Sequence, residues 1–123
     1  MTVSRFAFEP SAPLVLAGGL CGASGVALSA AAAHIGGAFT GTVASFLLAH
    51  ALALLAIGLV GGNKTLRLGG LVLLVGLVLF CGDLLARDFL GGRLLPLAAP
   101  TGGSLLILGW LIVAASAFSR SKS

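Results

Sequence analysis

Residues 10–63 read PSAPLVLAGGLCGASGVALSAAAAHIGGAFTGTVASFLLAHALALLAIGLVGGN and contain no Asp, Glu, Lys or Arg. About 20 apolar residues are enough for one helix to cross the hydrocarbon core of a bilayer. The stretch is therefore long enough for two crossings and a turn. The turn is predicted at residues 36–41, where chain-breaking residues gather. Two membrane-spanning helices are expected, near residues 13–33 and 42–60.

The composition of the whole chain is that of a membrane protein. Hydrophobic residues make up 59% of the 123 residues and charged residues only 8%, whereas a soluble domain usually carries about 25% charged residues. Apolar runs near residues 66–87 and 101–118 complete four spans, and none of the runs alternates as a membrane β-strand does. We predict an all-α membrane protein in which residues 1–123 form one integral membrane domain, a compact bundle of four transmembrane helices.

The basic residues are divided unevenly between the two sides of this bundle. Four spans place both termini and the loop between the second and third spans on one side. That side carries five basic residues and the other side two: Arg5, Lys64, Arg67, Arg120 and Lys122 against Arg87 and Arg93. Because cytoplasmic loops are enriched in Lys and Arg, both termini are predicted to be cytoplasmic. The net charge of +4 then reflects topology and contact with anionic lipid headgroups of the bilayer, and it requires no nucleic-acid partner.

The first span is expected to remain in the mature protein. Small residues at Ala31, Ala32 and Ala33 would suit a signal-peptide cleavage site. However, the apolar run before them is longer than the roughly 7–15 residues of a signal-peptide core.

Small residues are spaced so that the helices can approach one another closely. Helices in lipid associate through close contact rather than through hydrophobic burial, and small residues at i and i+4 permit that contact. Packing inside the bundle is the favoured interpretation of these stripes, and self-association is the alternative. The residues concerned are Gly18, Gly22, Gly25 and Ser29 in the first span, Gly69 and Gly76 in the third, and Gly102, Gly103 and Gly109 in the fourth.

Structural roles are also predicted for the two cysteines and for the start of the fourth span. Cys21 and Cys81 are expected at different depths, as free thiols rather than as a disulfide. The Gly102-Gly103 pair after Pro100 could bind an anion at a helix N-terminus. Tight helix packing is the preferred interpretation.

Ionisable side chains inside a span are costly and therefore mark candidate sites. The predicted topology brings His34, His50, Asp83, Arg87 and Thr101 to the outer part of the bilayer as one polar cluster. Asp83 and Arg87 stand at i and i+4 with the acid first, a favourable order on a helix face. A neutralising ion pair is the favoured interpretation. An ion or proton site at Asp83 is the alternative, although the arginine would favour the charged carboxylate.

The two histidines are predicted to have structural roles. His50 is expected to form a hydrogen bond across helices, to Asp83 or to the region of Thr101. His34 and His50 suggest a metal or haem site, but the spacing supplies no third ligand. We therefore expect no metal and no cofactor.

The sequence lacks the motifs of a catalytic site, including HExxH and a phosphate-binding loop, so we expect no catalytic residue and no enzyme. Two functions from different classes remain. The first is a structural or accessory membrane protein that packs with itself, as a homo-oligomer, or with a larger membrane complex. The alternative is a small transporter or channel-like protein that uses the polar cluster.

Several short motifs, in order along residues 14–118, resemble those of a bacterial family. They are Ala33-His34, the HALALL stretch at 50–55, the LFCG stretch at 79–82, and the APTGG stretch at 99–103 followed by Gly109-Trp110. They resemble the domain-of-unknown-function family four hundred and twenty-three, the YgdD-like small four-helix inner-membrane proteins. The resemblance implies four spans in the bacterial inner (plasma) membrane, and it supplies no mechanism because the family has no established activity.

The chain departs from the family pattern at three places. The family usually has glycines where this chain has residues 29–33, and it often has Tyr-Gln where this chain has Phe46-Leu47. A small polar residue is usual at the position of Asp83, so this carboxylate and its pairing with Arg87 are expected to be particular to this chain.

Overall fold

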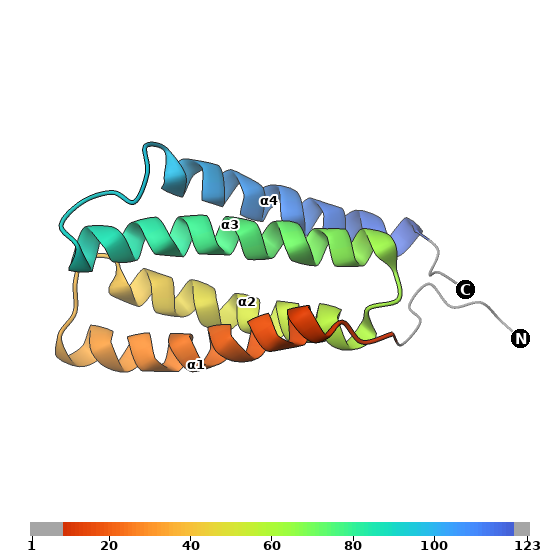
Figure 1. Ribbon diagram of the computed structural model, residues 1–123, viewed down its shortest axis with the longest axis horizontal. Coiled ribbons are helices and arrows are strands. Elements are labelled where there is room, and N and C mark those ends of the chain that lie inside the picture. The colour runs from red at the N-terminus through yellow and green to blue at the C-terminus, as the bar shows by residue number, and fades with distance from the viewer. Residues whose placement is uncertain (1–8, 120–123) are drawn as a thin grey trace, which may run out of the picture.

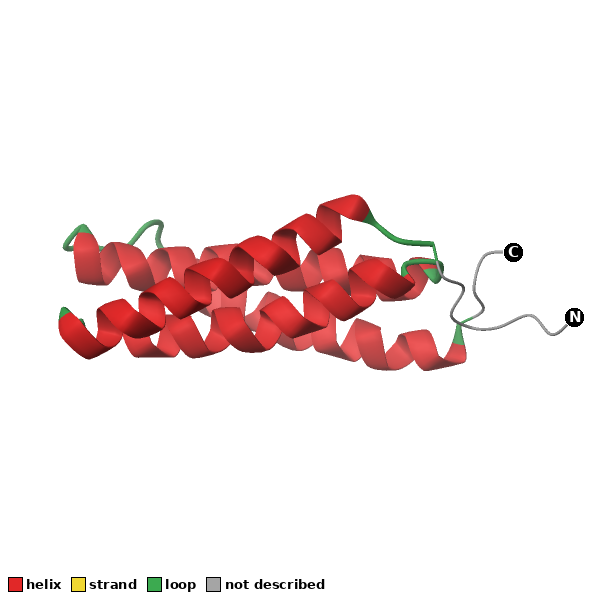
Figure 2. Cartoon of the chain, turned by 90° about the horizontal axis from the view of Figure 1, so that it is seen from below, coloured by secondary structure: helices red, strands yellow, loops and turns green. Residues whose placement is uncertain are grey.

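The computed structural model describes residues 9–119, which form four long α-helices in an antiparallel bundle (Figure 1). The helices are α1 (Ala12–His34), α2 (Thr40–Val60), α3 (Lys64–Phe89) and α4 (Ala98–Ala115), and α4 is followed by the short 3₁₀ helix η1 (Ser116–Phe118). Each span is long and apolar enough to cross a membrane. Figure 2 shows the helices running along the long axis of the bundle. Three of the basic residues used to predict orientation, Arg5, Arg120 and Lys122, lie outside the described residues.

The helix ends follow local sequence signals. Pro13 stands in the first turn of α1, where a missing N–H costs no hydrogen bond. Gly61 ends α2 with a φ of 61° and donates its N–H to Ile57 O, a left-handed cap that glycine adopts without strain. Asn63 then caps α3, because its side chain accepts a hydrogen bond from the N–H of Leu66.

The start of the fourth helix differs from the prediction. α4 begins at Ala98, so Pro100 lies in its first turn rather than in the preceding connection. A proline is tolerated there because the first-turn N–H groups have no partner within the helix. The regular helix also ends earlier than expected, at Ala115, and the chain continues as η1 to Phe118.

The bundle is built from two close helix pairs. α1 packs against α2 and α3 packs against α4, while α2 and α3 join the pairs and α1 barely touches α3. Leu14, Val43, Leu54, Leu73 and Leu77 are buried where these helices meet. The two ends of the described chain lie at the same end of the bundle. There the N–H of Glu9 donates to Val60 O at 2.8 Å, and Ser119 Oγ lies 2.9 Å from Thr65 Oγ1.

Most of the predicted packing glycines lie where two helix backbones meet. A Cβ added at Gly18 would stand 2.9 Å from Leu55 N, and one at Gly102 would stand 2.5 Å from Phe80 N. Such distances leave no room for a side chain. Gly25, Gly69, Gly76 and Gly109 are equally close to a facing helix, whereas Gly22 and Gly103 have ordinary clearance.

Ser29 does not follow this packing pattern, and Gly58 adds to it. Ser29 is exposed, and its hydroxyl donates to Gly25 O within α1. Gly58 of α2 was not among the predicted residues, yet a Cβ there would lie 2.8 Å from Val15 N. The α1–α2 contact therefore depends on glycines from both helices.

Candidate functional site

Asp83 and Arg87 form an ion pair near the end of α3. Arg87 Nη2 donates to Asp83 Oδ2 at 2.7 Å, and the second carboxylate oxygen accepts the backbone N–H of Leu94 at 2.8 Å. The Asp83 side chain is fully buried and that of Arg87 is 26% exposed. The Arg87 guanidinium also lies 5.7 Å from the centre of the Phe39 ring. Asp83 thus neutralises the arginine and fastens the loop after α3.

A second carboxylate, Asp88, joins the end of α3 to the start of α2. Its Oδ2 accepts hydrogen bonds from the backbone N–H of Phe39 at 2.9 Å and from Thr40 Oγ1 at 2.7 Å. It therefore acts as a helix cap supplied from a distant part of the chain. The residue spacing in the sequence does not single out Asp88. Phe39, at the start of α2, has no side chain that can cap the helix. This is the sequence signal that could have indicated a cap from elsewhere in the chain.

His50 lies halfway along α2, where only 6% of its surface is exposed. Trp110 Nε1 lies 3.1 Å from His50 Nε2, and His50 Nδ1 lies 2.7 Å from Phe46 O. An indole N–H can only donate, so Nε2 is the acceptor, and Nδ1 carries the proton that the Phe46 carbonyl accepts. Both ring nitrogens of a neutral imidazole are thereby satisfied. The partner of His50 is Trp110 of α4 rather than Asp83 or the Thr101 region.

The predicted polar cluster is thus divided among separate places. His50 and its aromatic neighbours Phe46 and Trp110 form one group, and Asp83 with Arg87 forms another. His34 and Thr101 are exposed. Within residues 9–119, no group of three or more His, Cys, Asp or Glu side chains could hold a metal ion. The arrangement can neutralise charge and fix helix positions.

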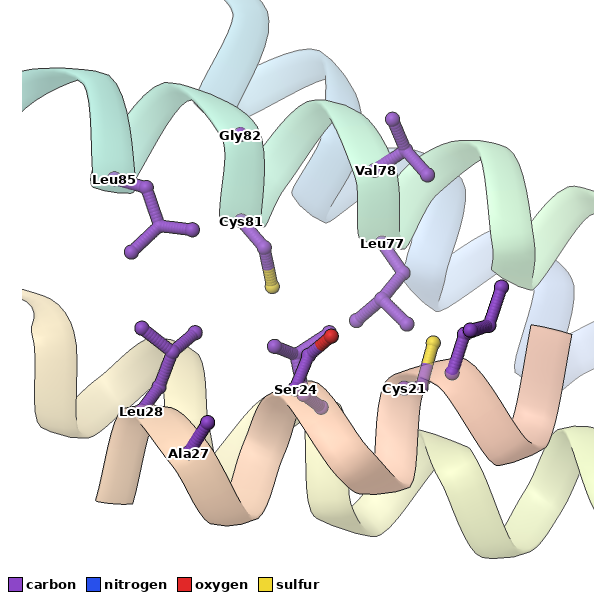
Figure 3. Close-up of a pocket in the computed structure, with 11 residues that line it drawn as sticks. Cys21, Ser24, Ala27, Leu28, Leu77, Val78, Cys81, Gly82 and Leu85 are labelled. Carbon is purple, nitrogen blue, oxygen red and sulfur yellow. The ribbon is translucent and has the colours of Figure 1, made fainter. Parts of the chain in front are cut away.

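An apolar groove of about 450 Å³ opens between α1 and α3, the two helices that barely touch. Cys21 and Cys81 are free thiols, as predicted, and Figure 3 shows their sulfurs directed into this groove from opposite helices. The positions of the two cysteines in the sequence did not predict that both would line the same groove. The lining residues are Leu20, Cys21, Ser24, Ala27 and Leu28 of α1, Leu47 of α2, and Leu77, Val78, Cys81, Gly82 and Leu85 of α3.

Comparison with known proteins identifies relatives of this chain. Residues 19–103 match the family described as "Protein of unknown function (DUF423)". A UPF0382 membrane protein of Haemophilus influenzae is 37% identical over 76 residues, 60% of either chain. The UPF0382 membrane protein SERP0230 of Staphylococcus epidermidis is 38% identical over 66 residues, which are 52% of this chain and 54% of the relative.

A third relative, the UPF0382 membrane protein SSP2132 of Staphylococcus saprophyticus, is 35% identical over 71 residues, 56% of this chain and 59% of its own. The match therefore spans less than two thirds of each relative. No solved structure matches this chain significantly. Because the family match covers more than half of the sequence and includes parts of all four helices, the chain belongs to the DUF423 family, a group of membrane proteins of unknown function.

Proposed function

We propose that this protein is a structural or accessory component of the bacterial inner membrane that packs with itself or with a larger membrane complex. The observation that carries the proposal is the outer face of α1. Gly19, Ala23, Ala27 and Ala30 follow one stripe of this helix, and all four are exposed. No other part of the described chain comes within 4 Å of a Cβ added at Gly19. Small residues at this spacing let a further helix approach closely in lipid.

The polar side chains support this function over transport. A transport pathway in a membrane protein is usually marked by ionisable groups that face a water-filled path. Here Asp83 is bonded to Arg87 and to the Leu94 N–H, and Asp88 is bonded to the start of α2. These carboxylates are used in holding the bundle together. We likewise propose that the protein catalyses no reaction and uses no cofactor.

We further propose that both termini lie in the cytoplasm. The support is the distribution of basic residues, five on the side of the termini and two on the other. Lys64 and Arg67, at the start of α3, belong to the larger group.

Enlarging the stripe on α1 tests the proposed function. The double variant Ala23→Leu/Ala30→Leu fills the exposed face that a partner helix would approach, and neither residue lines the groove beside α3. The control is Ala49→Leu/Ala56→Leu, which adds the same volume at two exposed positions of α2. Each protein is extracted gently from its native membrane, and its complexes are measured by native mass spectrometry. The α1 variant should lose about tenfold or more of the oligomer or complex, and the control should keep it.

Two results would contradict the proposal. The first is that wild-type protein is recovered only as a monomer without partners. The second is that the purified wild type conducts ions or protons in liposomes and that Asp83→Asn abolishes the flux. The second result would favour the transporter, because the ion pair would then have a role beyond packing.

A further inference from the structure

A second groove, separate from the one that contains the cysteines, lies between the starts of α1 and α3. Figure 1 shows these two helix starts at the same end of the bundle. The groove has a volume of about 440 Å³. Ser11, Pro13 and Leu14 line it from the α1 side. Lys64, Arg67, Leu68 and Leu71 line it from α3.

The α3 side of this groove changes from charged to apolar along the helix. Lys64 occupies the first position of α3 and Arg67 the fourth. Leu68 and Leu71 follow on the same face, because residues three, four and seven apart lie together on an α-helix. At about 1.5 Å per residue, Leu71 lies about 10 Å further along α3 than Lys64. The groove therefore offers cations at the end of the bundle and an apolar wall further along the helix.

The two cations form no ion pair with an acidic side chain within residues 9–119. The ion pair found there, Asp83–Arg87, lies at the opposite end of α3. The chain has three acidic residues in total, and Glu9 is the one on this side. Lys64 is exposed and Arg67 half-buried. Leu68 and Leu71 are each about half exposed, at 52% and 50%.

We propose that this groove binds an anionic phospholipid, with the headgroup phosphate at Lys64 and Arg67 and one acyl chain along Leu68 and Leu71. A phosphodiester supplies the charge that the two side chains lack, and basic pockets between transmembrane helices commonly bind such headgroups. The order of charge and apolar surface along α3 matches the order of headgroup and chain in a lipid. The site is independent of the proposed partner on α1, because none of its lining residues belongs to the small-residue stripe.

Native mass spectrometry of the delipidated full-length protein in detergent tests this site. Dioleoylphosphatidylglycerol is titrated as the anionic probe, and dioleoylphosphatidylcholine as the neutral one. The wild type should prefer the anionic lipid. Lys64→Gln/Arg67→Gln should weaken its binding about 25-fold, from two losses of about fivefold each. The control Arg120→Gln/Lys122→Gln removes the same charge from the C-terminal end of the sequence, and it should retain nearly full affinity.

A second pair of variants tests the apolar wall without changing charge. Leu71→Trp should obstruct the groove and weaken lipid binding, whereas Leu108→Trp, at a position of similar exposure on α4, should not. Equal binding of the two lipids would overturn the proposal, as would equal loss in both charge variants. Displacement of the lipid by inorganic phosphate alone would also overturn it, since the site would then hold a free anion. A monomer that binds the anionic lipid would support the lipid site. The proposed packing through α1 would still be decided by its own experiment.

Discussion

At the scale of single residues, His50 shows how a polar group is kept in the middle of a membrane bundle. Its ring is bonded at both nitrogens, to Phe46 within its own helix and to Trp110 of α4. An unpaired polar group in hydrocarbon costs several kcal/mol. α2 and α4 have little direct backbone contact, so this side-chain pair links two helices whose backbones lie apart.

A double-mutant cycle on His50→Phe and Trp110→Phe measures this pair. The single changes should each destabilise the protein, and the double change should cost less than their sum. The coupling energy should be about 0.6 kcal/mol and at most about 1.7, the range measured for hydrogen bonds between membrane helices. Unfolding by SDS in mixed micelles gives the four free energies. A coupling indistinguishable from zero would show that the bond adds nothing to stability.

Asp88 is expected to matter more for stability than its position near a loop suggests. Asp88→Ala would leave the Phe39 N–H and the Thr40 hydroxyl without their acceptor. The melting temperature should fall by about 5 °C, the effect usual for a lost helix cap in a small domain. Asp88→Asn keeps one acceptor oxygen and should cost less. The matched control Arg93→Gln changes a charge in the nearby exposed loop and should leave the melting temperature unchanged in detergent.

At the scale of helices, the four spans could be predicted because apolar runs of this length are typical of helices that cross a membrane. The helix partners could not, because lipid-facing and buried positions are both filled by Leu, Val and Ala. Leu73 is fully buried and Leu71 is half exposed, yet the two are chemically the same. The Asp83–Arg87 pair was predictable because both residues belong to one helix. The bonds from His50 to Trp110 and from Asp88 to Thr40 depend on how different helices align, which residue spacing does not contain.

Neighbouring glycines in α4 test the close approach of α3 and α4. A Cβ at Gly102 would meet the backbone of Phe80 at 2.5 Å, whereas one at Gly103 would lie 3.9 Å from the Phe80 ring. Gly102→Ala should therefore destabilise the protein by about 1–3 kcal/mol, the usual cost of overpacking. Gly103→Ala should be neutral or stabilising, since alanine favours a helix by up to about 1 kcal/mol over glycine. SDS unfolding compares the two, and equal effects would mean that the helices can separate without cost.

At the scale of the whole molecule, α1 is the least enclosed part of the bundle. Only 17% of its most apolar segment is buried, against 22% for the span that contains α4 and 44% for α2 and for α3. It contacts α2 closely but leaves open grooves beside α3 at two levels. A helix of this kind can accept lipid or protein neighbours without disturbing the α3–α4 pair. For this reason both the partner surface and the lipid site are placed on or beside α1.

The orientation of the molecule is open to direct measurement by cysteine labelling. In a chain carrying Cys21→Ala and Cys81→Ala, a single cysteine is introduced either at Gly92 or at Ser121. Gly92 is exposed in the loop between α3 and α4, and nothing in the described chain lies within 4 Å of a Cβ there. A membrane-impermeant maleimide should label Gly92→Cys in cells in which only the outer membrane is permeabilised. It should label Ser121→Cys only after the inner membrane is permeabilised as well. The reverse pattern would mean that five basic residues face outward against the positive-inside rule, and labelling of both positions from one side would mean that α4 does not cross the membrane.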